Sequence, residues 1–387
     1  MHAHEPEYLV KWAGRAHVHN EWVRESSLLG IARRKLLNFK KRHGDAPCDL
    51  SEPEWSIPER LVARRPALGS PGWEVLVKWR GQGYDACTWE PDGSGPLMQP
   101  ERLPLHLQLW ARQRRALERA GEAGRAAAAA AEARAQQQGV PELTSQPEWV
   151  RGAALMPHQL STLNWLRAMW ARRQSCVLAD EAGCGKTATV AAHLAGLIAD
   201  CKAAAPALVV VPLSMLPFWE GELAFWLPEG ANIVAYSGSV AARNALHDHE
   251  LWLQASSMDG KVGHSAVLTA AARGAASGGR VPKPDVVLTT YEAASSDLHA
   301  LRALPWCAVA LDLRQRSRSA AGKAHAALQE LTAGSGVQRL VLTGHRARGR
   351  GPDELFNVAA LVRPAGWEEA GEALPEGLDD PEAQVGG

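Results

Sequence analysis

The second half of the chain alternates short apolar runs with longer stretches of helical spacing. From Ala154 onward the apolar runs are SCVLAD, ALVVVP, NIVAYSG, DVVLTTYE, CAVALD and RLVLTG. Strands that are apolar at every position are covered on both faces, as in a parallel sheet packed between layers of helices. The pattern therefore predicts an α/β domain, which we call the lobe, at residues 147–364.

The first hundred residues have a different pattern, in which polar and apolar positions alternate within short segments. Two segments are similar to each other: EYLVKWAGRAHVHNEWV (Glu7 to Val23) and EVLVKWRGQGYDACTWE (Glu74 to Glu90). Each is typical of a strand with a Lys-Trp pair, a glycine turn and a short strand ending near a tryptophan. The repeat predicts tandem copies of one small β module, the first at residues 1–45 and the second at 53–106.

Two helical segments are expected outside the lobe. After the first copy, SLLGIARRKLLNFKKR predicts a helix packed across a small curved sheet, through apolar residues at helical spacing: Leu28, Ile31, Leu36 and Phe39. Residues 107–146 contain RAAAAAAEARAQQQ, which has high helix propensity but little to bury. We therefore expect a helical or partly disordered linker there, and an acidic tail at residues 365–387.

Composition adds local charge and excludes some classes. Acidic and basic residues balance at 42 each, so no overall field indicates a nucleic-acid or membrane partner. No apolar run reaches the roughly 20 residues of a membrane span, and the N-terminus is not typical of a signal peptide. The six cysteines form no C-x-x-C pair, which favours reduced intracellular thiols over a zinc site or a disulfide framework.

A basic run breaks the overall balance of charge. Ile31 to His43 carries six Lys/Arg and no acid. These cations could contact DNA phosphates, and the alternative is a solvated helical face. The candidates for DNA contact here are Arg33, Arg34, Lys35, Lys40, Lys41 and Arg42.

The strongest chemical signal is VLADEAGCGKTATV, Val177 to Val190. It places a glycine-flanked lysine after a buried strand and before a helix, where backbone N–H groups can face phosphates. In such a loop Lys186 is expected to reach the β- and γ-phosphates and Thr187 to ligate Mg²⁺. The sequence thus predicts a site for ATP and Mg²⁺.

The repeated module resembles the chromodomain, over roughly Glu5 to Leu105. PEWSIPERLVARR followed by VLVKWRGQGYDACTWE is similar to the second of the paired chromodomains in chromodomain–helicase–DNA-binding remodellers, nearest their PICKLE-like plant branch. The resemblance implies an aromatic cage for a methylated lysine, with Trp12, Trp55 and Trp79 as candidate walls. The alternative is that these are core and interface residues, as we expect for Trp22 and Trp89; Arg15 would repel a cation in the first cage.

The lobe resembles the first, RecA-like lobe of the Swi/Snf-type helicase-like ATPases. ALMPHQLSTLNWLRAMWARRQSCVLADEAGCGKTATVAAHLAGL matches the start of that family, and later segments follow in family order through RLVLTG and DELFNVAALVRP. The resemblance implies that Gln159 reads the adenine edge. It also implies an ATP-binding set of Gln159, Asp180, Glu181, Gly183, Cys184, Gly185, Lys186 and Thr187.

The acidic motif of that family is altered in ALDLRQRSRSAAGK. Asp312 takes the position of the Mg²⁺-binding aspartate, whereas Leu313 replaces the catalytic glutamate and Gln315 the histidine. Loss of a general base typically lowers the rate by about 10²–10⁴-fold, so we expect ATP binding with weak or no hydrolysis. The loop TGHRARGR lacks the family's threonine and proline. Two interpretations of its Arg346 and Arg348 stay open: they contact phosphate, or they are exposed residues of a solvated loop.

The resemblances together predict a nuclear, ATP-dependent chromatin remodelling factor. Its expected partners are nucleosomal DNA, histone tails and a larger remodelling complex. Because the family register continues to both ends while a second lobe is absent, we expect either a fragment or a short protein with a decayed ATPase lobe. The alternatives in function are a non-catalytic chromatin-binding adaptor and a helicase acting on free nucleic acid.

Overall fold

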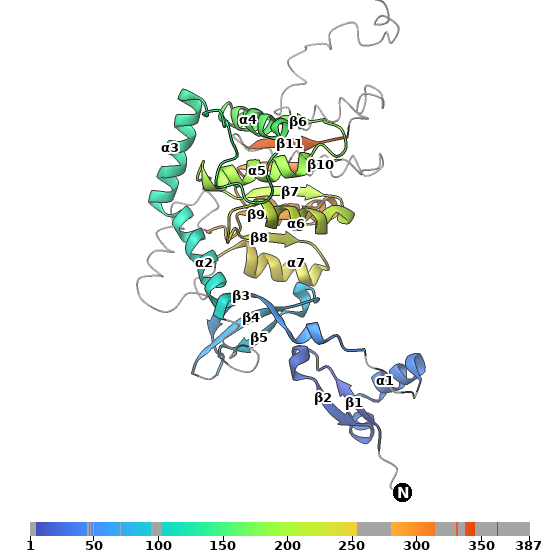
Figure 1. Ribbon diagram of the computed structural model, residues 1–387. Helices are drawn as coiled ribbons and strands as arrows, with labels where there is room; N and C mark the ends of the chain where they lie inside the picture. The colour runs from blue at the N-terminus through green and yellow to red at the C-terminus, as the bar shows by residue number, and fades with distance from the viewer. Residues whose placement is uncertain are drawn as a thin grey trace, which may run out of the picture.

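The computed structural model describes residues 5–44, 46, 48, 50–69, 71–93, 97, 103–253, 280–313, 330–331, 337–344 and 362. Figure 1 shows two small β modules at one end, a pair of linker helices along one side, and a larger α/β lobe. None of the described helices is long and apolar enough to cross a membrane.

The first module is a hairpin followed by a helix. Strands β1 (Glu7–Val10) and β2 (Glu21–Arg24) pair antiparallel, and α1 (Glu25–His43) follows. Leu28 and Leu36 are buried as expected, but Ile31 is 68% exposed. The prediction for Ile31 is wrong because α1 is kinked at Ala32 (φ −142°, ψ 37°), which breaks the helical spacing.

The second module is a three-stranded antiparallel sheet of β3 (Pro58–Pro66), β4 (Trp73–Trp79) and β5 (Thr88–Pro91). Leu61, Val75, Val77 and Trp79 form its core together with Leu109 of the linker. The linker itself is helical, with α2 (Leu103–Ala120) packed on β3 and the alanine-rich α3 (Glu122–Gln138) after it. Only Ala135 of α3 is buried, in keeping with a segment that has little to bury.

The lobe has the parallel sheet that the apolar runs predict. Its strands are β6 (Cys176–Leu178), β7 (Ala207–Val211), β8 (Ile233–Tyr236), β9 (Val286–Thr290), β10 (Ala308–Asp312) and β11 (Gln338–Leu342). They lie in the order β6-β11-β10-β7-β9-β8, and all neighbours are parallel. The strand before the phosphate loop, β6, is therefore at the margin of the described sheet but has a parallel neighbour.

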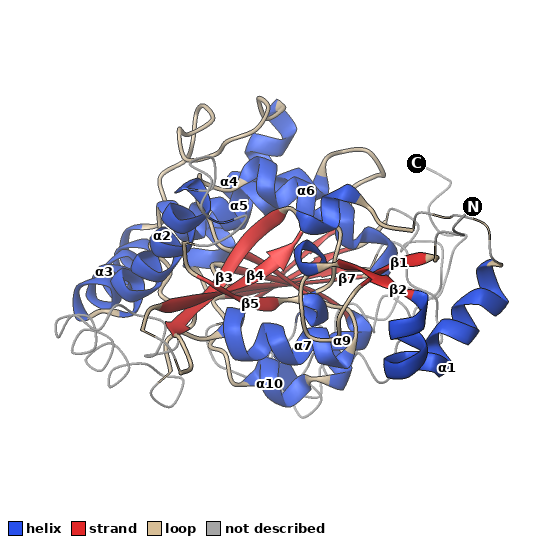
Figure 2. Ribbon diagram, turned by 90° about the horizontal axis from the view of Figure 1, so that it is seen from below, coloured by secondary structure: helices blue, strands red, loops and turns tan. Residues whose placement is uncertain are grey.

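Helices cover both faces of this sheet (Figure 2). On one face lie α4 (Pro157–Ala171), α5 (Lys186–Ala199) and α6 (Leu216–Trp226); on the other lie α7 (Val240–Leu246), α9 (Tyr291–Ser296) and α10 (Leu298–Arg302). Successive strand residues alternate between the two resulting cores, as Val209 and Val210 do. The α/β prediction is confirmed.

A buried cluster of charged and polar groups joins the second module to the lobe. At its centre is Glu250, 0% exposed, in a π-helical turn (His247–Leu251) after α7. Its carboxylate accepts from Arg60 Nε of β3 (2.6 Å), Lys283 Nζ (3.0 Å) and Tyr84 OH (3.2 Å). Burial alone would raise the pKa of Glu250, but Arg60, Lys283 and Arg112 outweigh it and hold the pKa at about 2.

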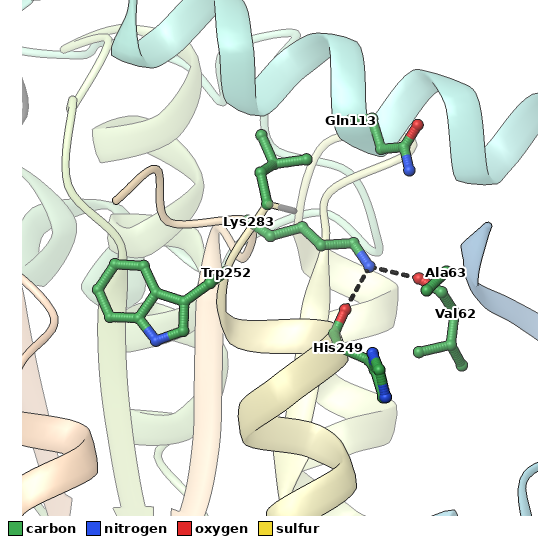
Figure 3. A pocket seen from close by; sticks show the side chains of 7 residues that line it. Val62, Ala63, Gln113, His249, Trp252 and Lys283 are labelled. Carbon is green, nitrogen blue, oxygen red and sulfur yellow. Dashed lines mark hydrogen bonds between the residues drawn. The ribbon is translucent and has the colours of Figure 1, made fainter. Parts of the chain in front are cut away.

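The Lys283 ammonium also ties the two parts together through carbonyl groups. It donates to Val62 O of the second module (2.6 Å) and to His249 O of the lobe (2.9 Å), beside the small pocket of Figure 3. Burial lowers the pKa of Lys283 to about 8, against the opposing effect of Glu250. The linker docks nearby, where Arg119 of α2 pairs with Asp285 and donates to Pro284 O (2.8 Å).

Candidate nucleotide-binding site

The phosphate loop runs from the end of β6 to the start of α5 at the carboxyl edge of the sheet. Gly183 (φ +91°) and Gly185 (φ +77°) have left-handed backbone conformations that glycine adopts without strain. A Cβ on Gly185 would lie 1.9 Å from Gln159 Nε2. The backbone conformation therefore favours glycine at this position, and any larger residue would also displace the end of the Gln159 side chain.

Lys186 and Thr187 are the first two residues of α5, and both are buried. Lys186 Nζ donates to the carbonyl of Asp180 and to that of Glu181 (2.6 Å). The ammonium thus lies over its own loop, next to the helix N-terminus, where the helix dipole favours an anion.

Gln159 closes one side of the loop from the first turn of α4. Its Oε1 accepts from Met156 N (2.8 Å), and its Nε2 donates to Cys184 O (3.4 Å). His158, which no sequence pattern distinguishes, donates from Nε2 to the same carbonyl (3.1 Å). The beginning of α4 is therefore packed against the phosphate loop, and both polar atoms of the Gln159 amide have partners within the chain.

Asp312 is the last residue of β10 and is buried at the same edge of the sheet. Register pairs Asp312 with Leu342, and Leu342 with Leu178, so Asp312 is level with the last residue of β6. Strand spacing of about 4.8 Å then puts it about 10 Å across the sheet from the start of the phosphate loop. Trp219 Nε1 donates to Asp312 Oδ2 (2.8 Å), and Tyr291 OH donates to Asp312 O (3.0 Å).

The oxygen atoms available at this edge are suitable ligands for Mg²⁺. Thr187 offers a hydroxyl and Asp312 a carboxylate, and hard cations of this kind prefer oxygen ligands. Mg²⁺ usually takes one or two protein oxygens together with phosphates and water, so a set this small is sufficient. Thr187 and Asp312 are the residues that would hold the ion.

Leu313, at the expected position of the general base, has a side chain that can neither accept nor donate a proton. It is partly buried and packs on the apolar core between the sheet and α9–α10, while its backbone N–H donates to Leu342 O (2.9 Å). The candidates Arg346 and Arg348, like Gln315, lie outside the described residues.

The three candidate cage tryptophans have different environments. Trp79 is 1% exposed and donates from Nε1 to Thr88 Oγ1 (3.0 Å), so it is a core residue and has no face open to a ligand. Trp55 is half-buried, with its ring 4.8 Å from that of His17 in the first module. Trp12 is also half-buried. The structure thus corrects the expectation for Trp79 as a cage wall.

Two further expectations for the modules need correction. Trp22, expected to be structural, is 66% exposed, because no described element covers its side of the two-stranded hairpin. Lys40 is half-buried and paired with Glu25 (2.7 Å), which neutralises it as a candidate for DNA contact. The other basic residues of α1 are exposed: Arg33, Arg34, Lys35, Lys41 and Arg42.

Family models match both parts of the chain. The SNF2-related domain matches residues 158–370, and the chromo (chromatin organisation modifier) domain matches residues 56–94. The first match covers the phosphate loop, Asp312 and Leu313. The second covers most of the three-stranded module.

Similar proteins come from plants and animals. The chain is 34% identical to Protein CHROMATIN REMODELING 4 of Arabidopsis thaliana over 93% of this chain and 15% of that protein. It is 29% identical to the CHD3-type chromatin-remodeling factor PICKLE of the same plant, over 90% and 24%. It is 26% identical to Chromodomain-helicase-DNA-binding protein 1 of Gallus gallus, over 97% and 21%. The chain thus spans less than a quarter of the length of these relatives.

Proposed function

The chain belongs to the SNF2-related domain family and is homologous to CHD-type chromatin remodellers, and from this premise we propose that it binds Mg·ATP in the lobe and chromatin through the modules. The setting is ATP-dependent chromatin remodelling in the nucleus. The observation that carries the proposal is the phosphate loop between β6 and α5, with Lys186 lying over it and Asp312 level with its start.

Each residue of the loop has a role in binding ATP. The backbone of the loop, from Asp180 through Gly183 to Gly185, surrounds the phosphates, with the side chains of Glu181 and Cys184 at its margin. Lys186 exchanges its two carbonyl partners for the β- and γ-phosphate oxygens, which are stronger, charged acceptors. Gln159, packed against Gly185, recognises the adenine edge.

Thr187 and Asp312 hold Mg²⁺. When bound, the ion offsets the negative charge of the β- and γ-phosphates. Leu313 leaves the attacking water without a base, so the site retains ATP much longer than it would with a glutamate there. The proposed activity of this chain is therefore binding of the nucleotide with slow or no turnover.

The modules are the part of the chain that binds chromatin. The remaining candidates to contact a methylated histone lysine are Trp55, half-buried beside His17 of the first module, and the half-buried Trp12. The exposed cations of α1 face phosphates of nucleosomal DNA, a contact that weakens as salt rises. We propose that the chain acts as part of a larger remodelling complex.

Leu313 favours a second candidate function, a chromatin-binding adaptor whose lobe serves only as a scaffold. The two differ in whether the lobe binds ATP through its phosphate loop. The experiment is calorimetric titration of the purified chain with Mg·ATP, beside Lys186→Ala and the control Lys41→Ala, which removes an exposed lysine of α1.

We expect binding by the wild-type chain, an affinity at least tenfold lower for Lys186→Ala, and wild-type affinity for Lys41→Ala. Absence of ATP binding, or binding that Lys186→Ala leaves unchanged, would overturn the proposal and favour the adaptor.

A further inference from the structure

Asp312 is held at the end of β10 by two aromatic side chains. The indole Nε1 of Trp219 donates to the carboxylate oxygen Oδ2 (2.8 Å), and the phenol of Tyr291 donates to the main-chain oxygen (3.0 Å). Trp219 is 0% exposed and Asp312 is 1% exposed, so water does not compete for the indole–carboxylate bond.

The two aromatic residues come from opposite faces of the sheet. Trp219 belongs to α6, which follows β7, and Tyr291 begins α9, which follows β9. Since β10 lies next to β7 in parallel, the helix that leaves β7 passes beside the end of β10. One face of the sheet thus fixes the carboxylate and the other fixes the backbone of the same residue.

The indole bond restricts where the carboxylate can point. An indole N–H is a donor only, and its bond to an ionised oxygen is charge-assisted, so it is shorter and stronger than a neutral one. Carboxylates that ligate metals are oriented by such hydrogen-bonded neighbours, and loss of a neighbour typically lowers metal affinity by about 10–100-fold.

We propose that Trp219 is a positioning residue for Mg²⁺, because it holds the Asp312 carboxylate in the orientation that the ion requires. This inference rests on the proposed function. The two positions of the acidic motif then differ in what they retain. At position 313 the group that would activate water is absent, whereas at position 312 the carboxylate that would hold the ion is present and is oriented by Trp219. The site is built to retain the Mg²⁺ form of the nucleotide.

The test compares Trp219→Phe with Trp226→Phe. Trp226 lies on the same helix and also donates to a carboxylate, Glu222 Oε2 (2.9 Å), but its bond does not involve Asp312. ATP affinity is measured by calorimetry in EDTA and at increasing Mg²⁺ concentrations, and folding of each variant is followed by circular dichroism. If Trp219→Phe does not fold, Trp219→Met takes its place, since a flexible side chain fills irregular space and also lacks the donor.

We expect Trp219→Phe to raise the Mg²⁺ concentration needed for half-maximal enhancement of ATP binding by about tenfold or more. Affinity in EDTA should stay at the wild-type value, and Trp226→Phe should match the wild type in both conditions. In the background of Asp312→Asn, the Trp219 substitution should have no further effect on Mg²⁺ dependence, because the two act on one interaction.

A folded Trp219 variant with wild-type Mg²⁺ dependence overturns this inference and leaves the proposed function intact. An equal loss of affinity in EDTA and in Mg²⁺ also overturns it, because that is the result of a purely structural role. If the wild-type chain binds no ATP in either condition, the proposed function fails and this inference fails with it.

Discussion

Asp312 and Leu313 are neighbours in sequence, but their side chains lie on different faces of the sheet. Asp312 reaches Trp219 of α6, whereas Leu313 packs on the apolar core beneath α9 and α10. This follows from the strict alternation of side chains along a strand. A carboxylate at position 313 would therefore be partly dehydrated, which raises its pKa and suits a general base.

Leu313→Glu should restore turnover. We expect the rate of ATP hydrolysis to rise by about 10²-fold or more, because a positioned base contributes a factor of that order. Single-turnover hydrolysis of labelled ATP, with and without duplex DNA, measures the change. Leu313→Gln is the control, since its amide has a similar shape but cannot take a proton. Equal rates for the two variants would favour the adaptor.

Sequence reasoning finds some residues of the site and misses others for a physical reason. Lys186 and Thr187 lie in a glycine-containing turn into a helix after an apolar strand, and Asp312 ends an apolar strand, so a local pattern marks each of them. Trp219 and His158 reach the site only through packing of α6 and α4, and nothing local separates Trp219 from the other tryptophans. For Trp79, sequence reasoning selects a residue that is not part of a site, since an aromatic residue beside a turn can be either a core residue or the wall of a ligand cage.

The helix after the phosphate loop, α5, is buried on all sides from Lys186 to Leu197. Among its apolar residues lies His193, whose Nε2 donates to Gln338 Oε1 at the start of β11 (2.8 Å). Burial lowers the pKa of His193 to about 4, although the bond to Gln338 opposes the shift. The element that carries Lys186 is thus sensitive to acid through a residue in its middle.

Stability should fall in acid because of His193. Between pH 6.5 and 4 the unfolded chain binds a proton on this residue that the folded chain excludes, so the free energy of unfolding rises with pH across that window. The full contribution is about 3 kcal/mol, present above pH 6.5 and lost as pH falls through 4. Urea unfolding from pH 3 to 7 measures it for the wild type and for His193→Asn.

His193→Asn cannot titrate, so its stability should depend less steeply on pH in the same window, even if it is lower throughout. Parallel pH profiles for the two proteins would contradict the assignment. Unequal slopes confined to pH values below 4 would also contradict it, because they would implicate carboxylates instead.

At the scale of elements the sequence is a good guide to strands and a poorer guide to geometry. All six apolar runs are strands, because continuous burial demands continuous apolar character. The order β6-β11-β10-β7-β9-β8 is set by pairing between distant segments and leaves no local trace. The kink at Ala32 is likewise not visible in the local sequence. The spacing of Leu28 and Leu36 predicts a helix, but it does not predict the break between them.

On the scale of the whole molecule, the second module and the lobe are joined by charges that the sequence presents as ordinary surface residues. Arg60 and Glu250 are 190 positions apart, and charged residues are rarely buried unless paired. Only the fold shows that each is the partner of the other. We expect the three-stranded module and the lobe to open together as one unit while this pair is intact.

Arg60→Met should separate the two parts. Loss of one partner from a buried ion pair typically costs about 3–5 kcal/mol, because it leaves the other charge uncompensated. Hydrogen exchange should then show backbone amides of β3–β5 opening independently of the lobe and exchanging about a hundredfold faster or more. Arg65→Met is the matched control, since Arg65 lies on the same strand but pairs with Glu74 inside the module (2.9 Å).

Faster exchange in both variants alike would mean that the module is merely weakened, and unchanged exchange in Arg60→Met would mean that the apolar contacts suffice. The double variant Arg60→Met/Glu250→Met should recover only part of the loss, because it leaves the buried Lys283 ammonium without its carboxylate partner.

The backbone near Lys283 has a consequence for the evolution of this chain. Leu253 N donates to Val281 O (3.0 Å), and Trp252 forms an isolated antiparallel bridge with Pro282, so the backbone on either side of residues 254–279 is joined by a hydrogen-bonded neck. The entropic cost of closing a loop between two fixed ends grows only with the logarithm of the loop's length. Residues can therefore be gained or lost there at little expense to the sheet, which makes this neck a natural place for descendants of one ancestor to diverge in size.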